Sequence, residues 1–409
     1  MIKGIKFRIY PTESQKELLA KSFGSARFLY NWGLDLKTKT YQSEKKSVTR
    51  FQLDKQLTEL KKEHVWLKEI PSQVLQQSLS DLDKAFVKFF KDKKGYPNFK
   101  SKHGKQSIRF PQSFSLTNNS IILPKLKAVK AKISKDLSCY EIKNITVSKS
   151  KSGKYFASIC YDDLKPIPTK VPLDENQAIG LDVGIKTSIV TSEAEEIGNP
   201  KFLRKSLRKL KILQRRLSKK TKGSKNRNKA RIKVAKHYEK VSNLRKDFLH
   251  KTSTTLVKQN DTVCIEDLNV SGMMKNHNLA QSVQDVSWAE FFKMLNYKAE
   301  WNGNNIIKIG RFWPSSKLCD CGTLNHNLTL ADRIWICAAC GVENQRDVLA
   351  ARNIKKFAFL SNPTQYFSEV KERQGMPELS VEEVSLEAPM KQKPAKSTKT
   401  RHRKESNAL

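Results

Sequence analysis

The chain has 409 residues, with 78 Lys and Arg against 40 Asp and Glu, which gives a formal net charge of +38. A hydrophobic fraction of 38% excludes a wholly disordered polymer, and the length predicts roughly two or three domains, each with its own core. Such a surplus of positive charge attracts phosphate polymers through counterion release, so we expect nucleic acid as the main partner.

The first residues predict a strand, because apolar and basic residues alternate over 2–10. A secretory signal needs an unbroken apolar core at this place, and no window of the chain approaches the roughly 20 apolar residues of a membrane span. We therefore expect a cytoplasmic protein without a membrane partner.

Helical patterns follow this first strand. Thr12 suits the N-cap of a first amphipathic helix, and a second helix covers 72–90, where apolar residues recur at helical spacing. Short apolar runs broken by Lys, Asn, Gly and Pro between about 106 and 170 predict further strands. Together these patterns predict a small β-barrel over 1–175, with a helical insertion at about 11–105.

A strongly basic stretch covers 201–251, where 21 residues are Lys or Arg and 2 are acidic, so that half of the net charge lies here. Leucines still recur within it, which predicts a helical hairpin with one packed face and one basic face. Charge of a single sign favours nucleic-acid contact over a salt-bridged surface, and Arg215, Arg216 and Arg231 are examples of side chains expected to hold the backbone. Residues 358–409 lack periodicity and predict a disordered tail.

Three acids lie in segments that could aim a carboxylate at a shared site. Asp182 and Glu266 each follow a short apolar run that predicts a buried strand, whereas Asp347 precedes a small-residue helix that can pack closely on a sheet. Each acid alone could be a surface or capping residue, but the order strand, strand, helix favours one site. Three such carboxylates can hold a pair of Mg²⁺ ions about 4 Å apart, which suits hydrolysis of a phosphodiester. Asp267 points to the opposite strand face and is the less favoured ligand.

The segments around these acids resemble the three motifs of a RuvC-type, RNase H-like nuclease: Gly-Leu-Asp-Val-Gly-Ile-Lys, Ile-Glu-Asp-Leu-Asn and Arg-Asp-x-x-Ala-Ala-x-Asn-Ile. Longer segments resemble the TnpB (OrfB) proteins of bacterial insertion sequences, and the match runs from residue 1 to about 357. These segments are 24–31, 95–102, 285–292 and 312–319.

The resemblance implies an RNA-guided DNA endonuclease related to type V CRISPR effectors. It implies a monomer in a ribonucleoprotein, in which a guide RNA from the transposon end pairs with double-stranded target DNA beside a short flanking motif. The expected fold is a mixed α/β and α+β multidomain chain: a wedge barrel with a helical recognition lobe, and a RuvC-like domain over 176–357 with a zinc ribbon at about 315–343. On the second predicted helix, Gln73, Gln76 and Gln77 could contact the bases of the flanking motif, because Gln pairs well with adenine.

Four cysteines cluster in the predicted zinc ribbon. Cys337 and Cys340 have the two-residue spacing of a zinc knuckle, whereas Cys319 and Cys321 are separated by one residue where the family has two. Two alternatives stay open: the first pair coordinates one Zn²⁺ with altered geometry, or one of its sulfurs is replaced by Asp320, His326 or water.

A second departure lies next to Asp347. Asn344 and Gln345 stand where the family usually has His and Asp, and Leu349 replaces an Asn. Because outer partners tune a metal site, these changes keep open RNA-guided DNA binding with weakened or no cleavage. A third function, strand transfer by a transposase, fits the same acidic triad, although the sequence has no obvious separate module for binding transposon ends.

Overall fold

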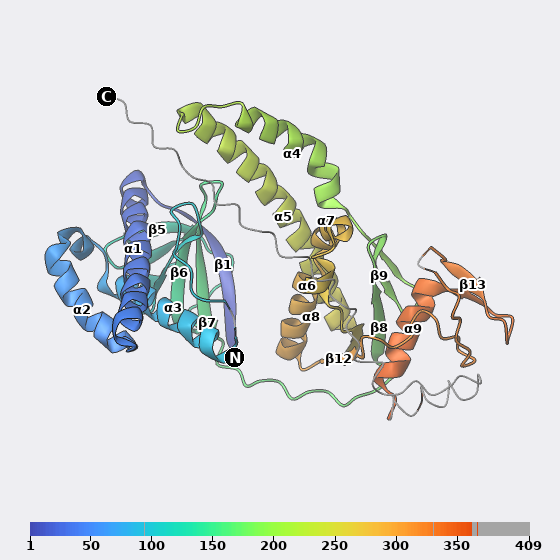
Figure 1. Ribbon diagram of the computed structural model, residues 1–409. Coiled ribbons are helices and arrows are strands. Elements are labelled where there is room, and N and C mark those ends of the chain that lie inside the picture. The colour runs from blue at the N-terminus through green and yellow to red at the C-terminus, as the bar shows by residue number, and fades with distance from the viewer. Residues whose placement is uncertain (94, 330, 362–365, 367–409) are drawn as a thin grey trace. The chain divides into compact units, whose positions relative to one another are not determined.

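The computed structural model describes residues 1–93, 95–329, 331–361 and 366 (Figure 1). Most of the predicted tail, 358–409, lies outside these residues. The described chain forms two compact units, each made from separate stretches of sequence. The first contains 1–177, 198–263 and 269–306, and the second contains 178–197, 264–268 and the described residues from 307 onward.

A seven-stranded antiparallel sheet lies in the first unit. Its first strand, β1 (Ile2–Tyr10), confirms the strand predicted from alternation and pairs with both β5 and β7. Side chains of β7 alternate between buried and half-buried, so one face of the sheet supplies the core. Closure of this sheet into a barrel stays a prediction. The strand order is β2-β6-β7-β1-β5-β4-β3, with β2 (Gln106–Phe110), β3 (Ser115–Leu116), β4 (Ser120–Leu123), β5 (Lys127–Lys132), β6 (Glu141–Lys149) and β7 (Tyr155–Asp162).

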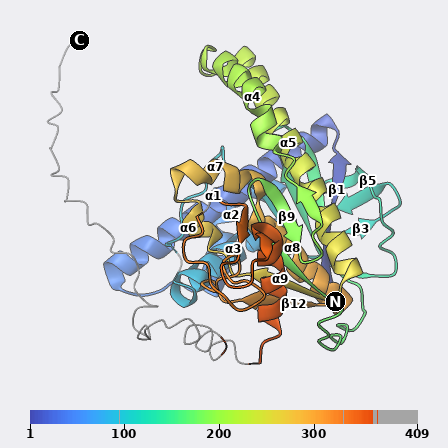
Figure 2. The same ribbon diagram turned by 90° about the vertical axis from the view of Figure 1, so that its right-hand side faces the viewer.

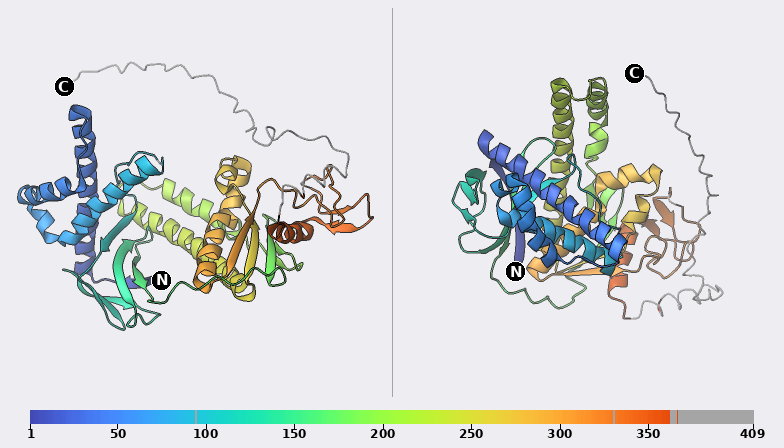
Figure 3. Two further views of the ribbon diagram at one scale, coloured as in Figure 1. Left: turned by 90° about the horizontal axis from the view of Figure 1, so that it is seen from below. Right: turned by 60° about the vertical axis from the view of Figure 1, so that its left-hand side comes forward.

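Helices are inserted between β1 and β2, as the sequence predicts (Figure 3). Thr12 caps the first helix in a reciprocal capping box with Gln15, which satisfies two backbone N–H groups. Gly33 lets this helix approach the third closely, since a Cβ there would lie 3.0 Å from Leu82. The inserted elements are α1 (Glu13–Glu44), α2 (Arg50–Glu63), a 3-10 turn (Val65–Glu69) and α3 (Ser72–Lys91).

The predicted basic hairpin forms two helices of the first unit, α4 (Phe202–Ser218) and α5 (Lys225–Gln259), of which the second continues past the predicted end. Asp285 anchors the start of α4 by accepting from the backbone N–H groups of Leu203 and Arg204, at 2.9 and 3.2 Å. The same buried carboxylate forms an ion pair with Arg245 of α5 at 3.1 Å. Three more helices complete this part: α6 (Val270–Met273), α7 (His277–Val286) and α8 (Trp288–Asn302).

A second sheet has the strand order β10-β9-β8-β11-β12. Helix α9 (Arg346–Ala358) packs along β8 and β9, which Figure 1 labels beside it, and Figure 2 shows α9 next to β9 in a second view. Gly180 permits this approach, because any Cβ there would collide with the carbonyl oxygen of Ala351 and lie 2.9 Å from the backbone nitrogen of Lys355. The strands are β8 (Ala178–Val183), β9 (Thr187–Thr191), β10 (Glu196–Gly198), β11 (Thr262–Glu266) and β12 (Asn305–Ile309).

A small two-stranded sheet, β13 (Ile334–Ile336) and β14 (Glu343–Gln345), leads directly into α9. Its core contains two of the clustered cysteines, Cys319 and Cys337, packed with Trp335. Across all described residues, no helix has the length and apolar content needed to cross a membrane.

Candidate functional site

The three predicted acids lie on three elements of the second unit. Asp182 is near the end of β8, and Glu266 is the last residue of β11, the strand beside β8 in the sheet. Asp347 is in the first turn of α9, where the helix dipole favours a negative charge. The predicted order of two strand carboxylates and one helix carboxylate is therefore present.

The pKa of the Asp182 carboxyl group is strongly raised. Burial is the main cause that raises its pKa to about 7, and the negative charges of Glu266 and Asp347 raise it further. Arg346 and Arg333 act in the opposite direction but do not compensate. A carboxyl group that ionises only near neutral pH, among other acids, marks a place where a cation would be stabilised.

Asp347 is held by Arg333, a residue that the sequence analysis missed. The guanidinium donates to both carboxylate oxygens of Asp347, at 2.9 and 3.1 Å. Pairing of β13 with β14 fixes this contact, because the backbone N–H of Arg346 donates to the Arg333 carbonyl at 2.8 Å. No spacing in the sequence singles out Arg333, since its partner is set by this tertiary pairing.

Glu266 is oriented by Ser315, which the sequence analysis also missed as a site residue. The Ser315 hydroxyl donates to Glu266 at 2.6 Å, and the fully buried Asn353 of α9 donates to the backbone carbonyls of Ser315 and Leu318. Asp267, the less favoured neighbour, instead pairs with Arg311 at 2.6 Å. Helix α9 therefore carries one acid and fixes the loop that orients another.

The Asp182 carboxylate interacts electrostatically with Glu266 and Asp347, but the three acids are not gathered like ligands of a single ion. Among the described residues, the one group of at least three His, Cys, Asp or Glu whose ligand atoms all lie within 4.8 Å of one another is the set of four cysteines. The acids interact electrostatically at longer range.

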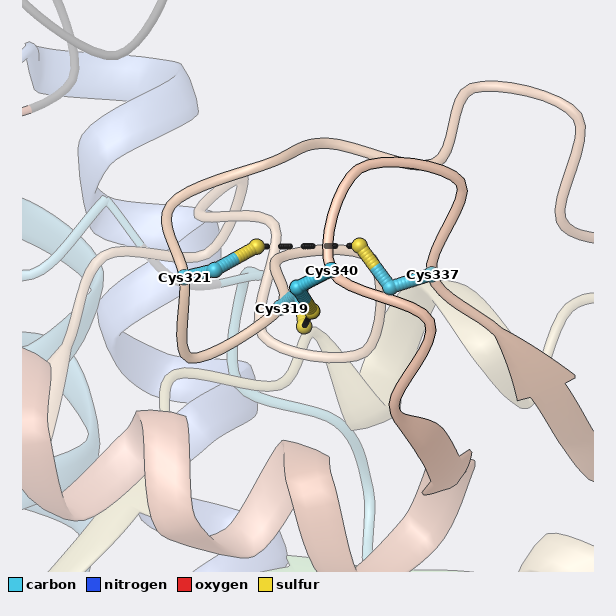
Figure 4. Close-up of side chains that lie close together, drawn as sticks. All are labelled: Cys319, Cys321, Cys337 and Cys340. Atoms are coloured by element: carbon cyan, nitrogen blue, oxygen red, sulfur yellow. Dashed lines mark hydrogen bonds between the residues drawn. The ribbon is translucent and has the colours of Figure 1, made fainter.

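The four cysteine sulfurs form a compact cluster (Figure 4). The sulfurs of Cys319 and Cys340 are 3.7 Å apart, and those of Cys321 and Cys337 are 3.6 Å apart. Thiolates arranged tetrahedrally at about 2.3 Å from one Zn²⁺ would be about 3.8 Å apart, so this geometry fits a zinc site. Both members of the short Cys-x-Cys pair take part, which favours the first of the two alternatives left by the sequence.

Turn geometry explains how the shortened pair still reaches the cluster. Gly322 and Gly341 each follow the second cysteine of a pair and have positive φ angles, 88° and 70°. The N–H of Gly322 donates to the Cys319 carbonyl, whereas that of Gly341 donates to the Cys337 carbonyl, which is one residue farther back along the chain. The turn after Cys319 is therefore one residue tighter than the turn after Cys337, which compensates for the shorter spacing of Cys319 and Cys321.

The four thiols of this cluster differ in how readily they ionise: the pKa values of Cys319 and Cys340 are raised, that of Cys340 to about 12, whereas the pKa of Cys337 is lowered. Although burial disfavours the Cys337 thiolate, the backbone N–H groups of Cys340 and Ala339 lower its pKa to about 6. The buried Asn344, at one of the positions that departs from the family, donates to the Cys319 sulfur at 3.5 Å. The altered position therefore supports the cysteine cluster directly.

The residues predicted to contact nucleic acid lie in the first unit. Arg215 and Arg216 on α4 and Arg231 on α5 are all exposed. On α3, Gln76 is exposed, whereas Gln73 and Gln77 are half-buried. Gln77 lines a cavity of about 280 Å³ together with four basic side chains and one acid: Arg27, Lys100, Lys105, Arg109 and Asp81.

Comparison with protein families gives three matches along the chain. Residues 158–277 match the OrfB_IS605 family, described as "Probable transposase", and 288–354 match the "Cas12f1-like, TNB domain". Residues 1–46 match a "Helix-turn-helix domain" of OrfB, although the structure has β1 and the single long helix α1 there.

Curated relatives cover most of the chain. A Streptomyces pristinaespiralis protein named "Putative RNA-guided DNA endonuclease" is 40% identical over 360 residues, which cover 86% of this chain and 88% of that protein. The chain belongs to the OrfB (TnpB) family. Another member, "Putative RNA-guided DNA endonuclease InsQ" of Escherichia coli strain K12, is 30% identical and covers 86% of this chain and 91% of its own length.

Solved structures show that the fold of this family member is shared with Cas12-type proteins. The chain in "Cryo-EM structure of the Cas12f1-sgRNA-target DNA complex" aligns with a TM-score of 0.56 at 16% identity, covering 87% of this chain and 98% of that one. "Structure of the mini-RNA-guided endonuclease CRISPR-Cas_phi3" aligns with a TM-score of 0.51 at 10% identity, covering 89% and 93%.

Proposed function

We propose that this chain is a transposon-encoded, RNA-guided DNA endonuclease that hydrolyses phosphodiesters of target DNA next to a short flanking motif. The observation that carries the proposal is the acidic centre, in which burial and then the charges of Glu266 and Asp347 raise the pKa of Asp182, in an otherwise strongly basic protein. Membership of the OrfB family and the names of its relatives support the same activity.

The donor set of this centre fits Mg²⁺. Three carboxylates offer the hard oxygen ligands that this ion prefers, and their mutual repulsion would be relieved by a divalent cation. Asp182, Glu266 and Asp347 would hold two ions, the number that suits hydrolysis of a phosphodiester. Such a pair would supply an activated water and would stabilise the leaving oxygen. In the second metal site, one Zn²⁺ would be held by Cys319, Cys321, Cys337 and Cys340.

Residues around the acids have positioning roles in this proposal. Ser315 fixes the orientation of the Glu266 carboxylate, and Asn353 fixes Ser315. Arg333 holds Asp347 and carries a positive charge at the place where a phosphate would approach. The strand that follows Arg333 leads to Cys337, so an ordered cysteine cluster would keep this arginine in place.

Sequence specificity would come from base pairing of a guide RNA derived from the transposon end, while the protein binds the backbone of RNA and duplex DNA. Arg215, Arg216 and Arg231 would hold that backbone, since they are exposed on the basic hairpin. Gln73, Gln76 and Gln77 would read the flanking motif, with Gln77 beside a basic cavity that suits a phosphate. One chain per ribonucleoprotein is the expected stoichiometry.

The test is cleavage of a plasmid library with randomised flanks by protein copurified with its RNA, in the presence of Mg²⁺. Wild type should cut beside one motif, and Asp182→Ala should reduce cutting below detection. Asp267→Asn is the matched control, because Asp267 is an acid of the same segment that pairs with Arg311. Loss of cutting in both variants, or in neither, would contradict the assignment.

A second function, RNA-guided DNA binding without cleavage, is favoured by one observation: Arg333 occupies both oxygens of Asp347. Footprinting by wild type on a guided target without any cutting would support it. The family description "Probable transposase" keeps strand transfer as a third outcome of the same assay. Joined DNA products in place of simple breaks would identify it.

A further inference from the structure

An exposed aromatic ring, Phe312, lies in the loop that follows β12 and leads to Ser315. Its side chain is 78% exposed, whereas the next residue, Trp313, packs against a buried cluster of the second unit and meets the ring of Phe357 on α9. A single exposed apolar side chain is ordinary on a protein surface. The place of Phe312 beside the acidic centre is the feature that needs an explanation.

Two hydrogen bonds anchor this loop to the strand end that carries Glu266. On one side of Phe312, the Nε–H of Arg311 donates to the backbone carbonyl of Asp267 at 2.9 Å, in addition to the ion pair between these two side chains. On the other side, the Ser315 hydroxyl donates to the Glu266 carboxylate at 2.6 Å. Phe312 is therefore held between contacts to two consecutive residues, Glu266 and Asp267.

The loop between these anchors is also fixed from within. The backbone N–H of Trp313 donates to the Gly310 carbonyl at 3.3 Å, and that of Ser315 donates to the Trp313 carbonyl at 2.8 Å. Only glycine fits at position 310, because a Cβ there would lie 2.5 Å from the indole nitrogen of Trp313. Since Trp313 packs inward while its neighbour is exposed, the loop presents the Phe312 ring to solvent with little freedom to move.

The ring is close to the acidic centre on the scale of a nucleic-acid strand. Three residue steps from Phe312 to Ser315 span at most about 11 Å between Cα atoms. A strand advances roughly 3.4 Å per nucleotide along a helix axis, and more when it is extended, so this distance covers about three nucleotides or fewer. A phosphodiester that reaches Glu266 therefore brings a neighbouring base within reach of the exposed ring.

The ring suits one occupant, an unpaired DNA strand. An aromatic face stacks with any base, because every base has a π face. In a duplex, the neighbouring base pairs cover both faces of each base, so no face is free for Phe312. In the proposed function the guide RNA is bound but not cut, so the strand that must come to Glu266 is DNA.

We propose that Phe312 is a positioning residue, which stacks on an unpaired base of the DNA strand at the acidic centre and so fixes the phosphodiester that is hydrolysed. The inference rests on the proposed function, which supplies the DNA strand. It adds the form of the substrate at this centre, an unpaired strand, and the side chain that holds it.

The first experiment places 2-aminopurine, a fluorescent base that stacking quenches, at successive positions of each DNA strand of a guided target. Protein copurified with its RNA carries Asp182→Ala throughout, so that the DNA is bound without being cut. Fluorescence near the expected cleavage position should be low with Phe312 and should rise in Phe312→Ala. Phe312→Tyr should restore the quenching, whereas Phe312→Leu, which keeps apolar area without a flat ring, should not. Phe51→Ala, which removes an 86% exposed Phe from α2, is the matched control.

The second experiment measures single-turnover cleavage in protein with an intact Asp182. Phe312→Ala should reduce the cleavage rate about 5- to 100-fold, the loss that corresponds to one stacked base, and Phe312→Tyr should restore the rate. Affinity for the guided target is set mainly by base pairing and should stay unchanged, as should the Mn²⁺ affinity and the thermal midpoint. These unchanged quantities separate positioning of the strand from damage to the fold or to the acidic centre.

Three results would overturn the proposal. In the first, Phe312→Ala matches Phe51→Ala in both cleavage rate and quenching. In the second, Phe312→Leu matches the unaltered ring, which makes Phe312 an apolar contact and not a stacking residue. In the third, only 2-aminopurine in the guide RNA responds to Phe312→Ala. Wild type that binds no guided target would refute the proposed function itself, and with it the strand assigned to Phe312; wild type that binds without cutting would leave the fluorescence test decisive.

Discussion

The cysteine cluster and the acidic centre are two candidate metal sites of the same unit, and they differ in how far they are assembled. The cysteine sulfurs are 3.6 and 3.7 Å apart in pairs, at the spacing of zinc ligands. The carboxylates are not gathered to a comparable spacing, and Arg333 holds one of them. Neutral thiols can approach one another before a cation arrives, whereas ionised carboxylates repel, so the difference follows from the charge of the ligands.

The strongest test of this difference is removal of one cysteine. Cys337→Ser should reduce bound zinc from about one ion per chain to nearly none and should lower the thermal midpoint, because binding energy of a structural zinc is folding energy. Elemental analysis and thermal melting measure both quantities. Cys160→Ser, in β7 and outside the cluster, is the control and should keep its zinc. Zinc retained in full by Cys337→Ser would contradict a four-sulfur site.

A second test disturbs the packing of α9, the helix that carries Asp347, on the sheet. Gly180→Ala should destabilise the protein by about 3 kcal/mol, because the added methyl group collides with the backbone of α9. The control is Gly198→Ala, where a Cβ would meet nothing within 4 Å. Chemical denaturation of both variants measures the difference. Equal stability of the two variants would mean that α9 shifts easily and that the acidic centre is not held by this contact.

A third test releases Asp347 from its ion pair. Arg333→Gln should raise the affinity of the acidic centre for Mn²⁺ about 10-fold, since it removes a competing cation and its repulsion of the metal. Electron paramagnetic resonance of free Mn²⁺ gives the affinity without reference to cleavage. Arg352→Gln changes an exposed position of α9, the helix that carries Asp347, and should leave the Mn²⁺ affinity unchanged. An unchanged or weaker affinity in Arg333→Gln would show that the arginine does not compete with the metal.

The smallest effect concerns pH. The pKa of Asp182 is raised to about 7, so this carboxyl group is protonated below that pH and ionised above it. A metal binds the ionised form, and the apparent Mn²⁺ affinity should fall up to tenfold for each pH unit below about 7. The cysteine cluster does not contain Asp182, so its zinc content should not follow the titration of this carboxyl group. Asp182→Asn should remove the step near pH 7; a step that persists would belong to another group.

The sequence predicts the ligands of both centres better than it predicts their surroundings. Period-2 alternation identifies β1, helical spacing identifies α3, and short apolar runs place Asp182 and Glu266 at strand ends. These patterns are local, and a local pattern predicts structure correctly where the packing of the core is consistent with it. The roles of Ser315 and Arg333 depend on contacts across 49 and 14 residues, which no local pattern encodes.

The short Cys-x-Cys pair also shows that spacing in the sequence does not predict the surroundings of a site. Spacing alone predicts a strained knuckle, and the positive φ of Gly322 removes the strain by tightening the turn. Asn344 was predicted as a weakened neighbour of Asp347, yet its side chain contacts Cys319. A substitution next to one metal site in sequence can therefore belong to the other site in space.

Because of Asp285, ionic strength should affect the folding of the basic hairpin and its attraction for phosphate to different extents. This carboxylate is buried where it joins the start of α4 to α5, so dissolved ions screen its contacts weakly. Most lysines and arginines along the hairpin are exposed, and their attraction for phosphate weakens steeply as salt rises. If the hairpin binds nucleic acid as proposed, high salt should release it while the junction of α4 and α5 stays folded. A salt wash followed by dialysis would then return a protein that is ready to be loaded with a different RNA.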